Sequence, residues 1–304
     1  MDRVLIHDIS HWNGDLTKYW QLFKDKGCQA IIVKATEGYA WWNIFLEHCR
    51  QARDFGFAVG AYHYYREGFV NVNGDWVYAD PTRQIQNFYD TVHRVGFELD
   101  LPPALDVEPA NNPNISSGRV DKCLVEMERM FGKIPILYSN PSTLKNIVKP
   151  HWSRYPLWLA HYTSEDKVEV PSVWDTWTIW QFSDRITYTP IGTDLKKPID
   201  HNYFNGDIID FCLWIEKQIP PTPEPDEPRD RVKITANFLR GRSNPKYFAG
   251  TSEVIFERGQ ILFLTDEAPV YEEASGITWV QVEVPSCPCC KMWISSNPKY
   301  IVKI

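Results

Sequence analysis

The chain has 304 residues, which is enough for one large domain and one small domain. Its formal net charge is −7, so we do not expect nucleic acid among its partners. No apolar run approaches the ~20 residues of a membrane span, and the N-terminus lacks the basic and apolar segments of a signal peptide. We therefore expect a globular protein that is either made in the cytoplasm and released by another route, or secreted with a leader that this sequence lacks.

Strand-like runs alternate with helical patterns over residues 1–218. In chain order, strands are predicted at 4–10, 30–38, 58–65, 102–109, 134–140, 155–162, 176–184 and 199–204, and amphipathic helices at 43–56, 81–96 and 118–132. Strands that alternate with helices favour parallel pairing, and about eight of them indicate an α/β fold of the (β/α) barrel type. Because the later connections lack helical patterns, we expect an irregular barrel.

A second, smaller domain follows a clear boundary. Residues 219–231 read IPPTPEPDEPRDR, a proline-rich acidic sequence typical of an extended linker. Beyond it, residues 232–304 contain short strand-like runs separated by turn residues, with no helical period. This part is predicted to be a small all-β barrel or sandwich.

The seven cysteines predict neither a metal site nor a disulfide framework. Cys287, Cys289 and Cys290 are crowded together without a nearby histidine, so a four-ligand zinc site is not expected. The other four lie singly in helix-like or buried-looking segments and are expected to be small buried hydrophobes; they are Cys28, Cys49, Cys123 and Cys212.

Polar or aromatic residues end nearly every predicted strand of the first part. They are Asp8, Ser10, Lys34, Glu37, Tyr62, Tyr64, Asp106, Glu108, Tyr138, Ser139, Trp158, His161, Gln181, Ser183, Asp200 and Asn202. Any strand becomes polar as it leaves the core, but in a parallel barrel the C-terminal strand ends converge on the active site. The number of such strand ends, four of them with carboxylates, favours an active site at this end of the barrel. The 13 tryptophans fit either a core or an aromatic groove.

The sharpest local feature is Asp106 followed by Glu108 on an apolar, proline-bounded strand. Side chains two apart on a strand point the same way, so two like charges would be buried side by side. One carboxyl group is then expected to keep its proton near neutral pH. A protonated acid beside ionised carboxylates is the combination that glycosidic cleavage requires.

Short motifs in a fixed order make residues 4–210 resemble the family 25 glycoside hydrolases, the muramidases of bacteria and their phages. The motifs are Asp8-Ile-Ser10, Lys34-Ala-Thr-Glu37-Gly38, Gly60-Ala-Tyr62-His63-Tyr64, Leu105-Asp106-Val-Glu108, Leu157-Trp158, Ile179-Trp180-Gln181 and Ile199-Asp200-His-Asn202. The stretch from Glu67 to Asp80 is longer than is usual in that family.

The resemblance implies a role for each matching residue. Glu108 would be the general acid, Asp106 would tune it and help to stabilise the transition state or position the substrate, and Asp8 and Asp200 would complete an acidic floor. The sugar-binding groove would be shaped by Lys34, Glu37, Tyr62, Tyr64, Tyr138, Trp158, Gln181 and Asn202. The implied substrate is bacterial peptidoglycan, cut at the β-1,4 bond between N-acetylmuramic acid and N-acetylglucosamine. No cofactor is implied, and a monomer is expected.

Residues 232–304 resemble bacterial SH3-type wall-binding domains, through Asn237-Phe-Leu-Arg240-Gly241, Met292-Trp-Ile-Ser295 and Tyr300. The domain layout fits a phage endolysin, and a bacterial autolysin is the alternative. The main rival function is a carbohydrate-binding protein with weak or no catalysis. A chitinase is disfavoured because the acids expected before Asp106 are missing, and a metal-dependent wall amidase because no histidine-rich motif is present.

Overall fold

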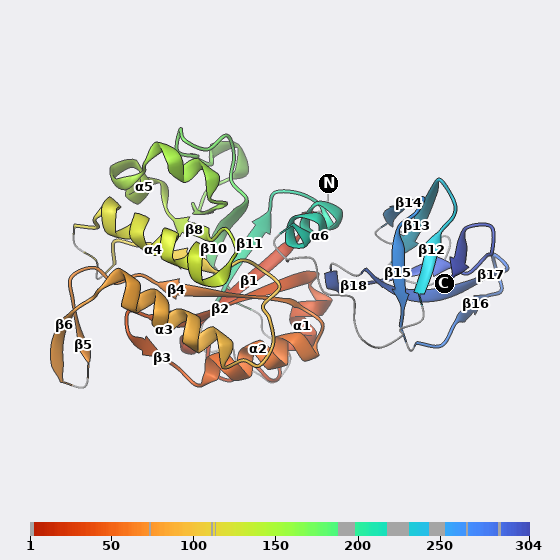
Figure 1. Ribbon diagram of the computed structural model, residues 1–304, viewed down its shortest axis with the longest axis horizontal. Coiled ribbons are helices and arrows are strands. Elements are labelled where there is room, and N and C mark those ends of the chain that lie inside the picture. The colour runs from red at the N-terminus through yellow and green to blue at the C-terminus, as the bar shows by residue number, and fades with distance from the viewer. Residues whose placement is uncertain are drawn as a thin grey trace. The chain divides into compact units, whose positions relative to one another are not determined.

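Eight strands from the first part of the chain close into a barrel (Figure 1). The computed structural model describes residues 3–187, 198–217, 231–242 and 253–304, apart from positions 73, 111, 113, 266, 285 and 286. The barrel strands are β1 (Leu5–Ile9), β2 (Cys28–Glu37), β4 (Ala58–Tyr64), β7 (Ala104–Asp106), β8 (Ile136–Ser139), β9 (Leu157–Ala160), β10 (Ile179–Ile186) and β11 (Ile199–Phe204). Each lies within or overlaps one of the predicted runs, so the predicted barrel is confirmed.

The direction of the last barrel strand differs from the expected parallel pairing. Neighbours from β1 through β2, β4, β7, β8 and β9 to β10 are parallel, but β11 is antiparallel to both β10 and β1. Parallel strands need a crossover connection, usually a helix, and the link from Ile186 to Ile199 has no helical pattern in its sequence. The first residues of β11 therefore lie at the C-terminal ends of the other strands.

Helices cover the outside of the barrel and bury the outer face of its strands. They are α1 (Trp20–Asp25), α2 (Ile44–Asp54), α3 (Pro81–His93), α4 (Ser117–Phe131), α5 (Pro141–Ile147) and α6 (Ile208–Glu216), with short 3₁₀ turns η1 (His11–Asn13), η2 (Pro150–Arg154) and η3 (Glu165–Lys167). Asp80 caps α3 by accepting from the Arg83 N–H, and Gly132 ends α4 in the left-handed conformation at φ 65°. The predicted helices at 43–56, 81–96 and 118–132 correspond to α2, α3 and α4.

The main hydrophobic core lies between the barrel and these helices. Large, fully buried side chains such as Trp20, Phe45, Phe88 and Trp152 pack against strand residues that include Ile31 and Leu137. Strand β2 is buried over nearly its whole length, as expected where both faces of a parallel sheet are covered. The rigid frame places the strand ends, and hence the polar side chains that follow them, in fixed positions.

Two small elements decorate this barrel. Strand β3 (Ala40–Trp41) pairs with the end of β2, and strands β5 (Phe69–Val72) and β6 (Asp75–Tyr78) form a separate two-stranded sheet. The β5–β6 hairpin lies in the stretch Glu67–Asp80 after β4 and projects from the barrel beside the start of α3 (Figure 1).

The second unit is all-β. The chain divides into Met1–Phe211 and Cys212–Ile304, and the second part contains β12 (Arg231–Ile234), β13 (Phe238–Arg242), β14 (Glu253–Glu257), β15 (Ile261–Leu264), β16 (Val270–Glu272), β17 (Ile277–Val284), β18 (Cys287–Ser295) and β19 (Ile301–Lys303). Its eight strands form one sheet around a separate core that includes Val232, Phe256, Val282 and Ile294.

The structure tests some of the expectations for the cysteines and a membrane span, but it leaves the predicted linker almost entirely undescribed. Cys28, Cys49 and Cys123 are buried free thiols, but Cys212 is disulfide-bonded, so a role as an isolated buried hydrophobe is wrong for that residue. The predicted linker 219–231 lies outside the described residues except for Arg231, and so do the side chains of Cys287, Cys289 and Cys290. Within the described residues, no helix is both long enough and apolar enough to cross a membrane.

Candidate active site

Four carboxylates come together at the mouth formed by the C-terminal ends of the parallel strands. Asp8 lies near the end of β1, Asp106 ends β7, Glu108 follows two residues later, and Asp200 is the second residue of β11. Because β11 is antiparallel, the strand register places Asp200 directly opposite Asp8. The sequence predicted that both acids approach one mouth, and the register confirms that placement.

Asp8 and Asp200 form a hydrogen-bonded pair that shares one proton. Burial, the Asp8 charge and the hydrogen bond to Asp8 raise the pKa of Asp200 to about 9. Burial also raises the pKa of Asp8, to about 6, although hydrogen bonds from Asn202 and Gln181 oppose this change. At neutral pH Asp200 is therefore protonated, and its hydroxyl group donates a hydrogen bond to the ionised Asp8.

Two buried amides hold Asp8 in its ionised form. Gln181 Nε2 and Asn202 Nδ2 donate to Asp8 Oδ2 over 3.0 and 2.8 Å. The other end of each amide is also fixed, since Tyr138 and Tyr162 donate to Gln181 Oε1 over 2.9 and 2.8 Å. Trp158 Nε1 donates to Asn202 Oδ1 over 2.7 Å. These contacts orient each amide with its N–H groups toward Asp8.

Asp106 and Glu108 form the second acidic pair. Burial raises the pKa of both, and the charge on Glu108 raises that of Asp106 further, to well above its usual range. Asp106 is 5% exposed, and its Oδ1 has no hydrogen-bond partner among the residues that the structure describes. Glu108 is half-buried, so it is the more accessible member of the pair. The raised pKa values mean that the pair holds a proton to higher pH than two isolated carboxyl groups would.

The Tyr138 hydroxyl lies within hydrogen-bond reach of both Glu108 and Gln181. A hydroxyl has one proton, so it can donate to only one of these acceptors at a time. It donates to Gln181 Oε1, and a hydrogen bond from the same hydroxyl to ionised Glu108 would stabilise the charged form, so the contact lowers the pKa of Glu108. Tyr162 keeps Gln181 Oε1 paired in either case.

A cationic cluster borders the acidic pair on the side of β2. Lys34 Nζ is 2.7 Å from Glu37 Oε2, and Arg66 is 3.1 Å from Glu37 Oε1. Burial opposes ionisation of Glu37, but these two cations give it a net lowered pKa. Lys34 also lies 4.5 Å from the centre of the Tyr64 ring, and its charge favours the ionised forms of Asp106 and Glu108.

The aromatic residues predicted to line a groove occupy two kinds of position. Trp158 and Tyr138 are almost fully buried, with ring centres 4.8 Å apart, and Trp158 meets the half-buried Tyr62 edge-on at 6.2 Å. Buried rings cannot offer a face to a sugar, so these residues act through their polar atoms and through packing. Among the described residues that follow the barrel strands, Trp12 and Tyr162 have exposed rings.

Sequence reasoning did not identify Tyr162, Arg66 or Asn112 as site residues. Tyr162 follows β9 by two residues, the same pattern that pointed to the other strand ends. Asn112 is 2% exposed and donates to the Glu108 carbonyl over 3.0 Å, a contact that no local pattern reveals. Over the described residues, no group of three or more His, Cys, Asp or Glu side chains is arranged to hold a metal ion.

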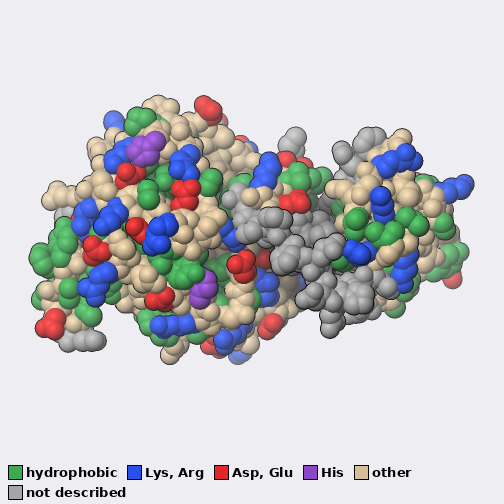
Figure 2. Space-filling model, in the orientation of Figure 1, with side chains coloured by type: hydrophobic (Ala, Val, Ile, Leu, Met, Phe, Trp, Pro, Cys, Tyr) green, Lys and Arg blue, Asp and Glu red, His purple; other side chains and the backbone are tan. Residues whose placement is uncertain are grey.

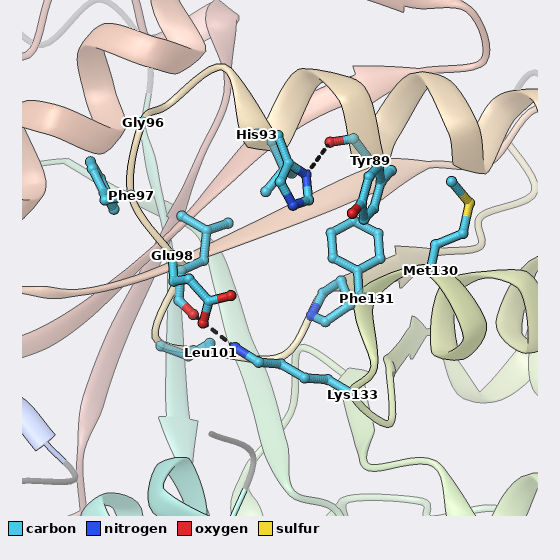
Figure 3. Close-up of a pocket in the computed structure, with 12 residues that line it drawn as sticks. Tyr89, His93, Gly96, Phe97, Glu98, Leu101, Met130, Phe131 and Lys133 are labelled. Atoms are coloured by element: carbon cyan, nitrogen blue, oxygen red, sulfur yellow. Dashed lines mark hydrogen bonds between the residues drawn. The ribbon is translucent and has the colours of Figure 1, made fainter. Parts of the chain in front are cut away.

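A pocket of about 400 Å³ lies at the other end of the barrel and is separate from these acids (Figure 3). It is lined by the ends of α3 and α4 and the segments that lead into β7 and β8, including Tyr89, His93, Phe131 and Lys133. Those segments enter the strands at their N-terminal ends, the side of a (β/α) barrel that usually contributes stability. The candidate active site is therefore the mouth that holds the four carboxylates, and this pocket is not part of it.

A barrel whose mouth combines protonated and ionised carboxylates belongs to the class of glycoside-cleaving enzymes. The family model described as "Glycosyl hydrolases family 25" matches residues 7–190. The chain therefore belongs to this family, and it is a glycoside hydrolase of the muramidase class.

Individual proteins show the same relationship. The chain is 28% identical over 217 residues to the "Uncharacterized protein YegX" of Escherichia coli, covering 69% of this chain and 72% of that protein. It is 27% identical over 217 residues to lysozyme M1 of Streptomyces globisporus, covering 66% and 67%. The structure of a family 25 glycosyl hydrolase from Bacillus anthracis superposes with a TM-score of 0.57 at 24% identity, over 69% of this chain and 94% of the other. That structural likeness extends over the barrel.

Proposed function

We propose that this protein hydrolyses the β-1,4 bond between N-acetylmuramic acid and N-acetylglucosamine in bacterial peptidoglycan, with Glu108 as the general acid. The observation that carries the proposal is the half-buried Glu108, whose pKa is raised by burial, at a mouth that also holds the ionised Asp8. The lysozyme relative supports the choice of substrate.

The proposed reaction starts with transfer of the Glu108 proton to the glycosidic oxygen. The bond from the anomeric carbon to that oxygen then breaks, and positive charge develops on the sugar ring. Asp8 stabilises this charge because Gln181 and Asn202 hold it ionised. Water supplies the hydroxyl group that adds to the anomeric carbon, and its remaining proton returns to a carboxylate of the site.

Asp106 fits a second role beside Glu108. Its Oδ1 is buried without a hydrogen-bond partner among the described residues, which is costly for a carboxyl oxygen. An N–H group of the substrate, such as that of an acetamido substituent, would provide the missing donor. Asp106 would thereby position the sugar beside Glu108, whose charge, together with burial, raises the pKa of Asp106.

The remaining site residues are proposed to hold and orient these groups. Lys34, Glu37 and Tyr64 would border the sugar on one side, and Tyr62 would border it beside Trp158. Tyr138, Gln181 and Asn202 would act mainly by fixing the carboxylates. No metal or organic cofactor takes part in the proposed reaction.

The test is to digest purified peptidoglycan with the wild type and with Glu108→Gln, then to reduce the products and identify the new ends by mass spectrometry. We expect the wild type to produce muramic acid reducing ends. With the variant, the rate of hydrolysis should fall by about 10³-fold or more. Glu98→Gln, an exposed carboxylate at the opposite end of the barrel, is the matched control and should keep full activity.

Other outcomes of the digestion would overturn parts of the proposal. N-acetylglucosamine ends would mean that a different bond is cut. Sedimentation of the protein with walls, without any new reducing ends, would favour the alternative of a carbohydrate-binding protein with weak or no catalysis.

For the second unit we propose an SH3-like domain that binds the bacterial wall. It contains a pocket of about 810 Å³ lined by Arg240, Arg242, Trp279, Asn297 and Tyr300, among others. Cations, aromatic rings and an amide are suited to the charged and amide groups of wall peptides. Tyr300→Ala, at an exposed ring, should weaken sedimentation of the Glu108→Gln protein with walls, and unchanged binding would contradict this assignment.

The combination of a hydrolase barrel and a wall-binding unit supports a role as a phage endolysin, or alternatively as a bacterial autolysin. In either case the protein would act on the cell wall as a monomer. Sedimentation velocity of the full chain tests the monomer, and lysis of cells by externally added enzyme, absent with Glu108→Gln, tests the site of action.

A further inference from the structure

The β5–β6 hairpin presents an aromatic face to solvent. Its register pairs Phe69 with Tyr78 and Asn71 with Trp76, so these four side chains share one face. Phe69, Trp76 and Tyr78 are 61%, 71% and 47% exposed, and the rings of Phe69 and Tyr78 touch edge to face at 5.2 Å. Figure 2 shows hydrophobic side chains gathered at the end of the molecule where Figure 1 places the hairpin. Three large rings so exposed on one short sheet indicate a contact surface.

The opposite face of the hairpin is the one that packs on the barrel. Val70 is buried and lies against Gly38, where an added Cβ would be 3.5 Å from its side chain. The hairpin is closed at its base by the Ala79 N–H, which donates to the Gly68 carbonyl over 2.7 Å. The aromatic face is therefore fixed outward, and burying it within its own domain would require the Val face to leave the barrel.

The base of the hairpin is joined to the loop that carries the catalytic acid. The Glu67 N–H donates to Asn112 Oδ1 over 2.8 Å, and Asn112 Nδ2 donates to the Glu108 carbonyl over 3.0 Å. Tyr64, at the end of β4, donates to the Ala110 carbonyl over 2.6 Å. The hairpin is thus held in a fixed position next to the Glu108 loop, where a long substrate leaving the mouth would meet it.

The charges around this face favour a neutral partner. No carboxylate or ammonium group lies on the aromatic face itself, and the neighbouring Arg119, 4.5 Å from the Tyr78 ring, is paired with Glu67 over 2.7 Å. An anionic lipid surface or an acidic peptide would find no unpaired cation among these residues. Sugar rings, in contrast, place apolar C–H faces on aromatic rings and satisfy their hydroxyl groups with water or an amide such as Asn71.

We propose that the aromatic face formed by Phe69, Asn71, Trp76 and Tyr78 binds the glycan strand beyond the sugars that are cleaved. This inference rests on the proposed function for its substrate. The hairpin would make the enzyme prefer long strands over short fragments, because only a long strand occupies the mouth and the hairpin together.

The test compares Trp76→Ala with the wild type on two substrates, namely soluble uncrosslinked glycan strands and a tetrasaccharide fragment. We expect KM for the long strands to rise about three- to tenfold, as for loss of one aromatic contact, with kcat unchanged and the tetrasaccharide unaffected. Phe69→Ala should behave in the same way, and Tyr271→Ala, an exposed aromatic residue of the second unit, is the control. Equal KM values for Trp76→Ala and wild type on long strands would overturn the proposal.

Binding measurements separate this proposal from the proposed activity. Titration of the Glu108→Gln protein with the same long strands should show weaker affinity when Trp76→Ala is added. If the wild type cuts no peptidoglycan but binding still depends on Trp76, the activity fails and the hairpin surface stands. If sedimentation shows a dimer that Trp76→Ala dissociates while strand affinity is unchanged, the face binds a second copy and the proposal is wrong.

Discussion

The Asp8 carboxylate keeps its charge in a buried position because two amides donate to it. Asn202→Ala removes the 2.8 Å hydrogen bond and leaves burial as the main influence, so the pKa of Asp8 should rise above its value of about 6. An ionised Asp8 is needed to stabilise the positive transition state, so activity is lost as pH falls through that pKa. We expect the acidic limb of the kcat/KM profile to move upward by about 1 pH unit.

The control for this experiment is Asn146→Ala, which removes an exposed amide on α5 and should leave the profile in place. A uniform loss of activity at every pH, with an unmoved acidic limb, would mean that Asn202 contributes to geometry alone.

The Tyr138 hydroxyl should set the alkaline limb of the same profile. Its hydrogen bond favours ionised Glu108, so Tyr138→Phe should raise the pKa of that acid and extend activity to higher pH. Tyr162→Phe removes the other hydroxyl from Gln181 and makes a matched comparison, since the alkaline limb should not move. Movement of the limb to lower pH in Tyr138→Phe would show that the hydroxyl instead supports the protonated form.

How far the site was predictable depends on whether a residue's role is visible in its own segment. Asp8, Asp106, Glu108 and Asp200 follow apolar runs, so the sequence indicated them as strand-end acids. The burial of Trp158 was not predictable, because it depends on packing between β8 and β9 and on a hydrogen bond to Asn202, 44 residues away. A tryptophan at a strand end looks the same in the sequence whether its face is open or covered.

The elements show a similar contrast between local and long-range information. Periodicity located the eight barrel strands, but the antiparallel direction of β11 is a property of its two neighbours and not of its own residues. Strands β5 and β6 were not predicted because Phe69–Val72 and Asp75–Tyr78 are short and pair only with each other. In these short segments the alternation between residues for a buried side and residues for an exposed side was too weak to identify a hairpin.

Asn112 connects three elements at the edge of the site and should be important for stability. Its amide bonds the Tyr65 carbonyl, the Glu108 carbonyl and the Glu67 N–H over 2.7, 3.0 and 2.8 Å, all in a buried position. Asn112→Ala leaves these groups unpaired, so the free energy of unfolding should fall by about 2–4 kcal/mol, with a lower kcat because the Glu108 loop is released. Urea denaturation and steady-state kinetics measure the two effects.

Asn43→Ala is the comparison for this variant, since Asn43 is exposed and its side chain makes no capping hydrogen bond to α2. A stability loss in Asn112→Ala no larger than in Asn43→Ala would mean that the network around Glu108 is held by the barrel strands alone.

At the scale of the whole molecule, the two units have separate hydrophobic cores, so damage to one core should leave the chemistry of the other intact. Gly241 in β13 offers a specific way to test this. A Cβ at that position would lie 2.6 Å from Phe256 Cε2 and 3.3 Å from Met292 Cβ, both in the second core. Gly241→Ala should therefore destabilise the second unit by about 1–3 kcal/mol through overpacking.

The consequence for function follows from the proposed division of labour between the units. Gly241→Ala should lower the thermal transition of the second unit and weaken binding to whole walls, while hydrolysis of a soluble glycan fragment at 25 °C stays at the wild-type rate. Gly118→Ala, in α4 of the barrel, is the matched substitution, because its nearest neighbour to a Cβ is Ser116 Oγ at 3.9 Å and no clash arises. Equal losses on walls and on the soluble fragment would show that the barrel depends on the second unit for its own activity.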